Sequence, residues 1–508
     1  MAIPGQHLIV MKNLAYADLE SRFRRILTLR DAGEILQWDY ATIMPSGGAS
    51  GRADQLAELE AVRHGLICAT ETGDLLDQAD QTGGLEGWQS ANLAAMKHMW
   101  GHATALSEQQ VTDLSRASSA CETVWRTARA EADFAAVLPS LEKLVGLVRD
   151  AANAKSQALG LSPYDALLDE YEPGGRSADI DQQFKVLEDF LPGFLNQVLA
   201  RQGSEPAAIA PKGPFPEAAQ RALGIKLMEA LGFDFDHGRL DTSLHPFCGG
   251  TSEDVRITTR YDENDYSSAL MGVLHETGHA LYERGLPADW RYQPVGDALG
   301  MATHESQSLL VEMQVCRSRP FLEFAAPLMA EAFGGSGPAW SPDNLYKLLG
   351  RVDRSFIRVD ADEVTYPLHV ILRYRLERAV IGGDLKVGDL PAAWNDGMED
   401  LLGVRPPNDA EGCLQDIHWY DGAWGYFPTY TLGAMTAAQL FAAAKDSQPD
   451  ISQGIPKGDF KPLMGWLGDN VHGLGSSIPL PDLLTRATGR PLDAKTFIDH
   501  LKSRYLPD

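Results

Sequence analysis

One short segment, VLHETGHALYERG, constrains this chain more than any other, because it places His275, Glu276 and His279 at the spacing HExxH. Residues four apart on an α-helix lie one turn above each other on the same face. Two imidazoles in that position can bind one Zn²⁺, and the intervening Glu can accept a proton from a reacting water. The segment therefore predicts a helix that carries part of a catalytic metal site.

The expected helix has two unlike faces. Gly272 and Ser268 fall on the side of the two histidines, whereas Val273 and Ala280 fall on the opposite side. A chance pair of histidines on a buried face would have Leu or Val around it instead. The small residues leave room for an ion and a substrate, which favours a metal site.

A third protein ligand is needed, because catalytic zinc ordinarily takes three and leaves a further position open. The metzincin pattern is excluded, since the chain has Tyr282 and Gly285 where that pattern requires Gly and His. The downstream segment GMATHESQSLLVEMQ offers His304, Glu305 and Glu312. The small and polar neighbours of Glu305 favour it, while the spacing leaves the other two open.

A second pair of histidines, His98 and His102, stands four residues apart in KHMWGH. It has no acid between the histidines and carries Met99 and Trp100 instead. We therefore expect a helix surface or packing feature here rather than a second metal site.

One segment alternates with a period of two, which predicts a strand. In DVRITTRY, one side would present Val255, Ile257, Thr259 and Tyr261, and the other Arg256, Thr258 and Arg260. It is followed by DENDY, whose Asp or Asn can cap the helix that carries HETGH. The edge of such a strand could bind an extended peptide beside the metal.

Most of the remaining chain shows the 3.6-residue period of amphipathic helices. The clearest stripes cover Leu14 to Trp38, Arg52 to His64, Leu138 to Ala152, Asp181 to Arg201 and Pro216 to Leu231. Pro- and Gly-rich breaks, expected to be loops rather than interdomain linkers, fall at Gly203 to Pro216, Gly334 to Pro342 and Ser447 to Lys457.

The bulk properties exclude several classes of partner. The 508 residues carry a formal net charge of −26, which repels phosphate backbones and anionic lipids, so we expect neither nucleic acid nor membrane as a partner. The five cysteines are scattered without a CxxC pair, which favours a reducing compartment. Residues 1–20 lack the pattern of a signal peptide, and no apolar run reaches 18 residues. The expected location is the cytoplasm.

Several separate motifs now resemble those of one family. They are WDYATIMPSGG, with Tyr40 in place of the usual Gln, PYDALLDEYEPG, HPF, DVRIT, HETGH, HESQ, RVDADEVTYPLH, GCLQDIHW and GYFPTYTLG, in that order. Together they make the chain similar to the M32 metallocarboxypeptidases of the thermostable carboxypeptidase Taq type, over nearly its whole length.

The resemblance implies a mainly α-helical HExxH-metallopeptidase fold, with a small antiparallel β-sheet beside a deep active-site groove. We expect a single catalytic domain over 1–508, in which residues about 1–240 form one wall of the groove and residues about 241–508 carry the metal site. By the family motif, His275, His279 and Glu305 bind one metal ion per chain, usually Zn²⁺ with Co²⁺ as an alternative, and Glu276 is the catalytic residue. A homodimer is also implied.

The implied activity is the removal of C-terminal amino acids from peptides, one at a time, with broad side-chain tolerance and a poor response to proline. Two alternatives remain. One is an oligoendopeptidase or dipeptidyl carboxypeptidase that shares the HExxH helix, and the other is a non-catalytic peptide-binding relative. The intact set of expected ligands and base disfavours the second alternative.

An exopeptidase needs a cation for the free terminal carboxylate of its substrate, and a guanidinium binds a carboxylate well. Arg358 in RVDADE is expected to provide it by its family motif, with a structural salt bridge to Asp360 or Asp362 as the alternative. Arg256 is the second candidate, although it could equally pair with Asp254.

A hydrogen-bond donor must also stabilise the oxyanion of the tetrahedral intermediate. The candidates are His418, Tyr430 and Tyr426, which lie in polar and aromatic segments without a clean core period. A structural, hydrogen-bonding role is the alternative for His418.

Overall fold

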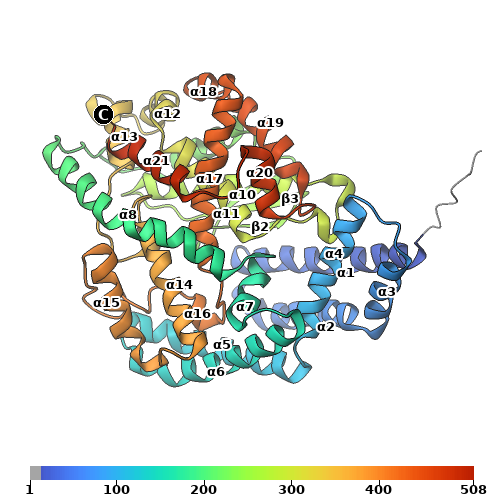
Figure 1. Ribbon diagram of the computed structural model, residues 1–508. Helices are drawn as coiled ribbons and strands as arrows, with labels where there is room; N and C mark the ends of the chain where they lie inside the picture. Colours follow the sequence, from blue (N-terminus) through green and yellow to red (C-terminus); the bar gives the residue numbers. More distant parts are fainter. Residues whose placement is uncertain (1–12, 508) are drawn as a thin grey trace, which may run out of the picture.

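Helices dominate the computed structural model, which describes residues 13–507 and is drawn in Figure 1. The expectation about a signal peptide concerned residues 1–20, of which residues 1–12 lie outside the described residues. None of the described helices is long and apolar enough to cross a membrane. The predicted fold class, mainly α with a small sheet, is confirmed.

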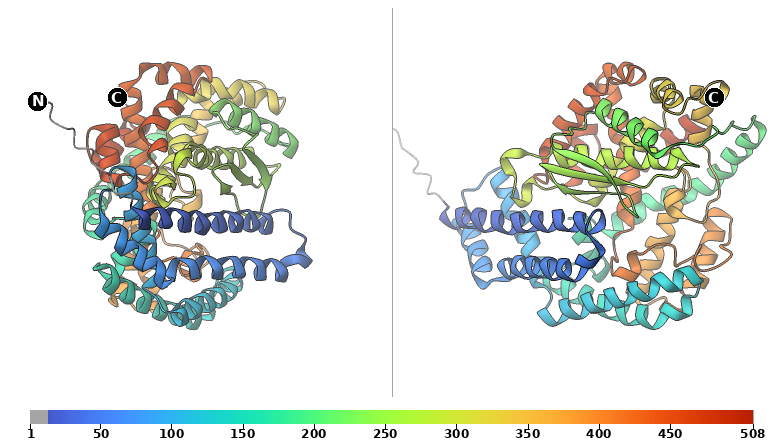
Figure 2. Two further views of the ribbon diagram at one scale, coloured as in Figure 1. Left: turned by 90° about the vertical axis from the view of Figure 1, so that its right-hand side faces the viewer. Right: turned by 180° about the vertical axis from the view of Figure 1, so that it is seen from behind.

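The first four helices form a cluster with an apolar core of its own. These helices are α1 (Leu14–Ala41), α2 (Ala49–Cys68), α3 (Thr70–Thr82) and α4 (Trp88–Thr104). Figure 2 shows α1 and α2 as a long antiparallel hairpin along one side of the molecule. The core residues Phe23, Ile26 and Leu27 of α1 are fully buried against this cluster, in agreement with the predicted helical stripe.

The next five helices contribute to the main core. They are α5 (Glu108–Glu131), α6 (Phe134–Leu159), α7 (Pro163–Tyr171), α8 (Ser177–Ser204) and α9 (Glu217–Leu231). The stripe predicted in α6 is buried, as Leu141 and Leu144 illustrate.

A three-stranded sheet precedes the HETGH helix, in the order β1-β3-β2. Its strands are β1 (Gly238–Thr242), β2 (Phe247–Thr251) and β3 (Asp254–Thr259). β2 and β3 are antiparallel, but β1 runs parallel to β3, so the expectation of an antiparallel sheet was wrong for this pair. The reason is topological: the β2–β3 hairpin occupies one edge of β3, and β1 pairs with the other edge in the same direction.

The remaining helices complete the main core around α17. They are α10 (Tyr266–Gly285), α11 (Met301–Leu309), α12 (Arg319–Ala332), α13 (Pro342–Leu349), α14 (Tyr366–Gly382), α15 (Leu390–Leu402), α16 (His418–Asp421), α17 (Pro428–Ser447), α18 (Pro449–Gly454), α19 (Lys461–Asn470), α20 (Leu480–Thr488) and α21 (Ala494–Tyr505). A seven-residue π-helix, η4 (Leu310–Cys316), continues α11 directly.

The three expected loops differ in outcome. Residues 205–216 contain neither helix nor strand, and the stretch 334–342 holds only a short 3₁₀ turn before α13 begins. The third stretch, expected as a loop, instead contains α18, so that expectation was wrong. Proline is favoured in the first turn of a helix, and Pro449 begins α18 rather than preventing it.

Helix α10 packs its apolar side on the sheet and leaves the opposite side to the site. Val273 and Ala280 of α10 share a small core with Leu240, Val255 and Ile257 of the sheet. The predicted cap is present, because the Asp265 carboxylate accepts a hydrogen bond from the backbone N–H of Ser267 at 2.9 Å. The sheet therefore sets the orientation of the helix that carries both histidines.

Candidate active site

Three side chains from two consecutive helices converge on one point. The Nε2 atoms of His275 and His279, on α10, lie 3.8 and 3.4 Å from Oε2 of Glu305, on α11. One ligand atom from each of the three residues lies within 4.8 Å of the other two. A hydroxyl also holds the carboxylate in place, since Ser308 Oγ donates to Glu305 Oε2 at 3.2 Å.

These separations fit a metal ion better than direct hydrogen bonds. Ordinary N–H···O bonds are about 2.7–3.2 Å long. Two ligand atoms bound tetrahedrally at about 2.0–2.1 Å from one zinc ion lie about 3.3 Å apart. The observed 3.4 and 3.8 Å are closer to the second value. Two imidazole nitrogens and a carboxylate oxygen are also the donor types that Zn²⁺ and Co²⁺ accept.

Two glycines allow the helices to approach closely enough for this convergence. A Cβ atom on Gly278, inside the HETGH motif, would lie 2.4 Å from the carbonyl oxygen of Gln307 on α11. A Cβ atom on Gly433 of α17 would lie 2.9 Å from Cβ of Glu305. Any larger residue at either position would push α11 away from its neighbours, and Glu305 would move with it.

Glu276 lies between the two histidines in sequence and is nearly buried, with 8% of its surface exposed. Burial raises the pKa of its carboxyl group to about 7, whereas the neighbouring His275 acts in the opposite direction. A carboxylate with a pKa near neutrality can both accept and return a proton at neutral pH.

The other two candidate ligands, Glu312 and His304, lie outside the convergent group. Glu312, on the π-helix, accepts a hydrogen bond from Nδ1 of His275 at 3.0 Å, on the side of the ring away from Nε2. The Arg317 guanidinium binds the other Glu312 oxygen at 2.7 Å. His304 instead contacts Glu283, with 2.8 Å between Nε2 and Oε1. Neither His304 nor Glu312 belongs to the convergent group, although the sequence had left both open as ligands.

Arg358 belongs to a buried charge cluster that the sequence did not reveal. Its Nε and Nη2 atoms lie 3.2 and 2.8 Å from the two carboxylate oxygens of Asp416. Arg373 shares the same carboxylate, with Nε 2.7 Å from Oδ2. Burial alone would raise the pKa of Asp416, but the two guanidiniums hold it well below its usual range. Two guanidiniums and one carboxylate leave one positive charge uncompensated within this cluster.

The alternative prediction for Arg358, a structural salt bridge to Asp360 or Asp362, is only partly correct. Arg358 does form a salt bridge, but its partner is Asp416 rather than Asp360 or Asp362. Asp362 instead accepts hydrogen bonds from the backbone N–H groups of Val364 and Thr365. The distance of 58 residues between Arg358 and Asp416 explains why local sequence could not identify this pair.

His418, Tyr430 and Tyr426 form one aromatic group next to Arg358. The Tyr430 hydroxyl lies 3.1 Å from Nε2 of His418. The Arg358 guanidinium lies over the Tyr430 ring, 4.6 Å from its centroid. The rings of Tyr426 and Tyr430 are 5.2 Å apart. Burial raises the pKa of Tyr430 to about 12 and lowers that of His418 to about 4, so both are neutral at pH 7. Tyr430 lies on α17, the helix whose Gly433 packs against Glu305, and the Glu305 carboxylate acts to raise the pKa of Tyr430.

Arg256 lies on β3 and contacts a different set of residues. Its Nη2 atom is 2.6 Å from Asp254, and its guanidinium stacks on the Trp38 ring at 4.4 Å. The salt bridge that the sequence allowed as an alternative is thus present.

Glu172 is a further residue of the site region that sequence reasoning missed. It is 4% exposed, and its carboxylate accepts a hydrogen bond from the Ala302 backbone N–H, at the start of α11, at 2.9 Å. Burial raises the pKa of Glu172 to about 7. The sequence did signal Glu172 through its place in the family-like block PYDALLDEYEPG. It did not signal that Glu172 would cap α11, because that helix begins about 130 residues later.

Comparisons with known proteins agree with this geometry. A family model described as carboxypeptidase Taq (M32) metallopeptidase matches residues 18–505. Thermostable carboxypeptidase 1 of Thermus thermophilus is 36% identical over 502 residues, covering 97% of this chain and 98% of the relative. The solved structure of Trypanosoma cruzi metallocarboxypeptidase 1 has a TM-score of 0.95 and 40% identity, covering 97% of this chain and 100% of that one. The chain therefore belongs to the carboxypeptidase Taq (M32) family of metallopeptidases.

Proposed function

We propose that this member of the M32 family is a metal-dependent carboxypeptidase that removes single amino acids from the free C-terminus of peptides. Its membership of the family supports a metallopeptidase activity. The observation that carries the carboxypeptidase assignment is the uncompensated positive charge of the Arg358–Asp416–Arg373 cluster, which lies beside Tyr430 of α17, the helix that packs against Glu305.

His275, His279 and Glu305 would hold one divalent cation, for which we propose Zn²⁺, with Co²⁺ as an alternative. The convergence of their Nε2 and Oε2 atoms and the chemistry of the donors support this set. When bound, such a cation polarises the scissile carbonyl group and acidifies the attacking water. Glu312 would orient His275 through Nδ1, as carboxylates commonly do behind metal-binding histidines.

Glu276 would act as the general base. Its burial keeps the pKa of its carboxyl group near 7 without the cation, so the group can accept the proton of the attacking water. The protonated carboxyl would then donate that proton to the leaving amine, which restores the carboxylate for the next turnover.

Tyr430 and His418 would stabilise the oxyanion or position the substrate. The Tyr430 phenol stays protonated because its pKa is raised to about 12, so its O–H can donate. The contact with the neutral His418 would orient the hydroxyl. Tyr426, stacked beside them, is a weaker candidate for the same role.

Arg358 would bind the terminal carboxylate of the substrate. Asp416 orients its guanidinium but is shared with Arg373, so the pair of cations still attracts one more anion. A buried cation without full compensation is costly, and a substrate carboxylate would reduce that cost. Arg256 is the second candidate, although Asp254 already neutralises it.

We further propose a single functional unit over 1–508, in which residues about 1–240 form one wall of a substrate groove. Broad side-chain tolerance, a poor response to proline, assembly as a homodimer and a cytoplasmic location complete the proposal. They rest on the resemblance to the family and on the composition of the chain.

One assay tests the activity. Free-acid and C-terminally amidated forms of one peptide are incubated with the zinc- or cobalt-loaded protein, with and without chelator, and followed by timed mass spectrometry. We expect successive loss of single C-terminal residues from the free acid alone, abolished by chelator. Equal cleavage of both forms would indicate an endopeptidase, losses of two residues a dipeptidyl carboxypeptidase, and no cleavage a peptide-binding protein.

A further inference from the structure

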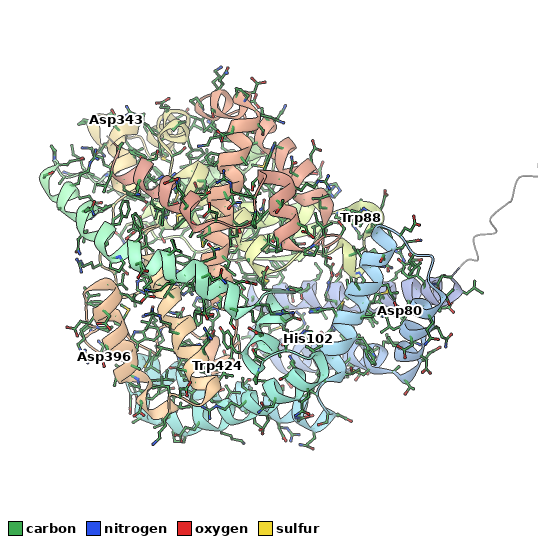
Figure 3. All side chains as sticks on the ribbon, in the orientation of Figure 1. Asp80, Trp88, His102, Asp343, Asp396 and Trp424 are labelled. Carbon is green, nitrogen blue, oxygen red and sulfur yellow. The ribbon has the colours of Figure 1, made fainter. Side chains whose placement is uncertain are left out.

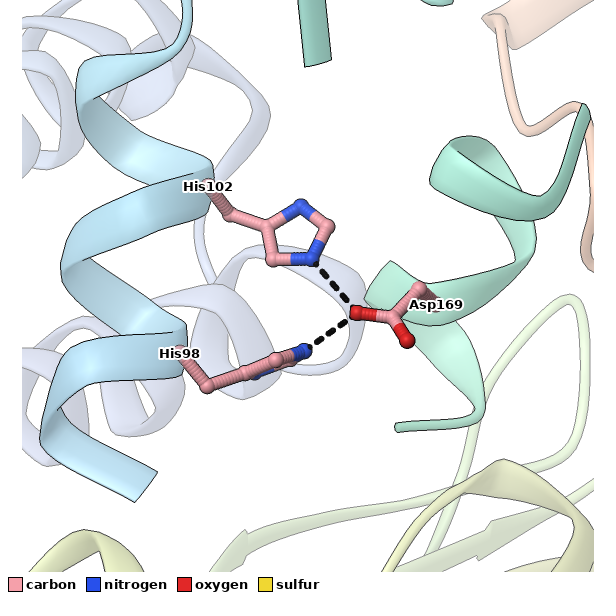
Figure 4. Close-up of side chains that lie close together, drawn as sticks. All are labelled: His98, His102 and Asp169. Atoms are coloured by element: carbon pink, nitrogen blue, oxygen red, sulfur yellow. Dashed lines mark hydrogen bonds and ion pairs between the residues drawn. The ribbon is translucent and has the colours of Figure 1, made fainter. Parts of the chain in front are cut away.

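The fold brings a third ligand to the histidine pair that the sequence treated as a packing feature. His98 and His102 extend from one side of α4 toward Asp169 of α7, as Figure 4 shows. The Nε2 atoms of both histidines contact the same oxygen, Asp169 Oδ2, at 2.7 and 3.1 Å. One donor atom from each residue lies within 4.8 Å of the other two, as in the catalytic cluster.

The two histidine pairs are built alike. His98 and His102 have ring centroids 4.6 Å apart and inclined by 61°, and His275 and His279 have centroids 5.0 Å apart and inclined by 81°. In both pairs the Nε2 atoms face a carboxylate from another helix. In both, that carboxylate is fixed by neighbouring donors, so it does not have to be ordered when an ion binds.

Asp169 is the fixed member of this second group. Its Oδ1 atom accepts hydrogen bonds from the Gly174 backbone N–H and from Arg176, both at 3.0 Å. This leaves Oδ2 directed at the two histidines. The Arg176 side chain is 38% exposed, so water screens its charge.

One difference separates the two groups. The 2.7 and 3.1 Å contacts are hydrogen-bond lengths, whereas tetrahedral ligands of one zinc ion lie about 3.3 Å apart. Binding of an ion would therefore require His98 to withdraw by on the order of 0.6 Å. His98 has this freedom, because 32% of its side chain is exposed, and the same exposure leaves coordination positions open to water.

We propose that His98, His102 and Asp169 form a second cation site, selective for a borderline transition metal such as Zn²⁺, Co²⁺, Ni²⁺ or Cu²⁺. Two imidazoles and one carboxylate suit these ions, whereas Mg²⁺ and Ca²⁺ prefer all-oxygen ligand sets. The site binds more weakly than the catalytic one, because the ion has to replace two existing hydrogen bonds.

The position of the site indicates a structural role. Helix α4 belongs to the separate N-terminal core, and α7 contributes Leu167 and Leu168 to the main core. Figure 3 places His102 where these two parts of the molecule meet. An ion held by both helices links the two cores, and it stabilises the folded state because the unfolded chain lacks the site.

The test counts bound metal in untagged protein. Wild type is titrated with Co²⁺ after removal of metal, and bound metal is followed by visible absorption and elemental analysis. The main variant is His98→Gln, whose amide N–H can still donate to Asp169 but which is a poor metal ligand. The matched control is His237→Gln, because His237 also contacts an aspartate, Asp234, at 2.6 Å but has no second histidine. A Glu305→Ala variant separates this site from the catalytic one.

We expect two equivalents of Co²⁺ in wild type and in His237→Gln, and one in His98→Gln. The second-site affinity in His98→Gln falls by more than about 100-fold, since loss of an outer-layer partner alone costs about 10–100-fold. Saturation of the second site raises Tm by about 1–3 °C in wild type and not in His98→Gln. Glu305→Ala retains the weaker equivalent. The proposal would be overturned if wild type bound no equivalent of Co²⁺ that is lost in His98→Gln and retained in Glu305→Ala, whatever the fate of the catalytic metal.

Discussion

The Nδ1 atom of His275 lies 3.0 Å from Oε2 of Glu312, and Arg317 donates a hydrogen bond to the other carboxylate oxygen of Glu312. This contact leaves Nε2 of His275 facing Glu305 and His279, so the orientation of the ring is set before any ion arrives. The π-helix that carries Glu312 follows α11 without a break. One continuous segment therefore supplies both the proposed carboxylate ligand and the carboxylate behind the first histidine.

Replacing Glu312 with Gln should weaken metal binding by about 10- to 100-fold, because the neutral amide orients His275 less firmly and makes its imidazole less basic. The affinity is measured by competition with a chelator. Glu377→Gln is the matched control, since Glu377 is also buried but contacts Tyr164 and Trp419 instead. Equal affinity in Glu312→Gln and wild type would rule out this role for Glu312.

Replacing Glu305 with Ala should release the catalytic metal and abolish peptide cleavage, because two imidazoles alone leave the ion poorly held. Metal content after gel filtration, with metal supplied at one equivalent, and the cleavage rate are both measured. His304→Gln, the control at the adjacent position, should retain both. If Glu305→Ala keeps stoichiometric metal and a normal rate, Glu312 or His304 must be the ligand.

Replacing Glu276 with Gln should lower kcat by at least about 100-fold and leave the metal content unchanged, because the amide keeps the shape but cannot accept the proton. The same role predicts that wild-type kcat/KM falls as the pH drops below the pKa of Glu276, where the base is protonated. That pKa is about 7 without the cation, and a bound cation lowers it. Loss of metal in Glu276→Gln would instead make Glu276 a ligand.

Replacing Arg358 with Ala should lower kcat/KM for a free-acid peptide by about 30- to 1000-fold, equivalent to about 2–4 kcal/mol. Arg358→Lys should recover little, because an ammonium lacks the planar fork. Asp416 keeps Arg373 as a partner in both variants, so folding should be retained. Rates are compared for free-acid and amidated peptides. A preference for the free acid that survives in Arg358→Ala would move the role to Arg256 or another cation.

Replacing Glu172 with Gln should make stability less dependent on pH. The carboxyl group has a pKa of about 7 when folded and about 4.5 when unfolded, so the folded state binds more protons between these values. Wild type therefore loses up to about 3 kcal/mol of stability from this group as pH rises through that window. The Gln side chain cannot lose a proton, so the free energy of unfolding of the variant should rise relative to that of wild type between pH 5 and pH 8. Urea unfolding at both pH values measures this difference. The same difference at both pH values would contradict the raised pKa.

Local pattern was sufficient for most of the helices and for the motif-bearing part of the site. The apolar stripes of α1, α6, α8 and α9 predicted these helices because a 3.6-residue period is a property of neighbouring residues. The expectation of a loop over Ser447 to Lys457 failed, because α18 begins at Pro449. The antiparallel sheet implied by the family resemblance failed at β1, whose direction depends on a partner strand later in the sequence.

Local patterns alone were enough to predict the mainly helical fold, the HETGH helix with a cap from the DENDY segment, and the family. The pairing of distant charged groups became visible only in the packed structure. Glu312 contacts His275, Arg373 shares Asp416 with Arg358, and Asp169 contacts both His98 and His102. Periodicity and capping act over a few residues, so the sequence displays them directly. Burial and electrostatic pairing depend on the distances between side chains, which exist only once the helices have packed.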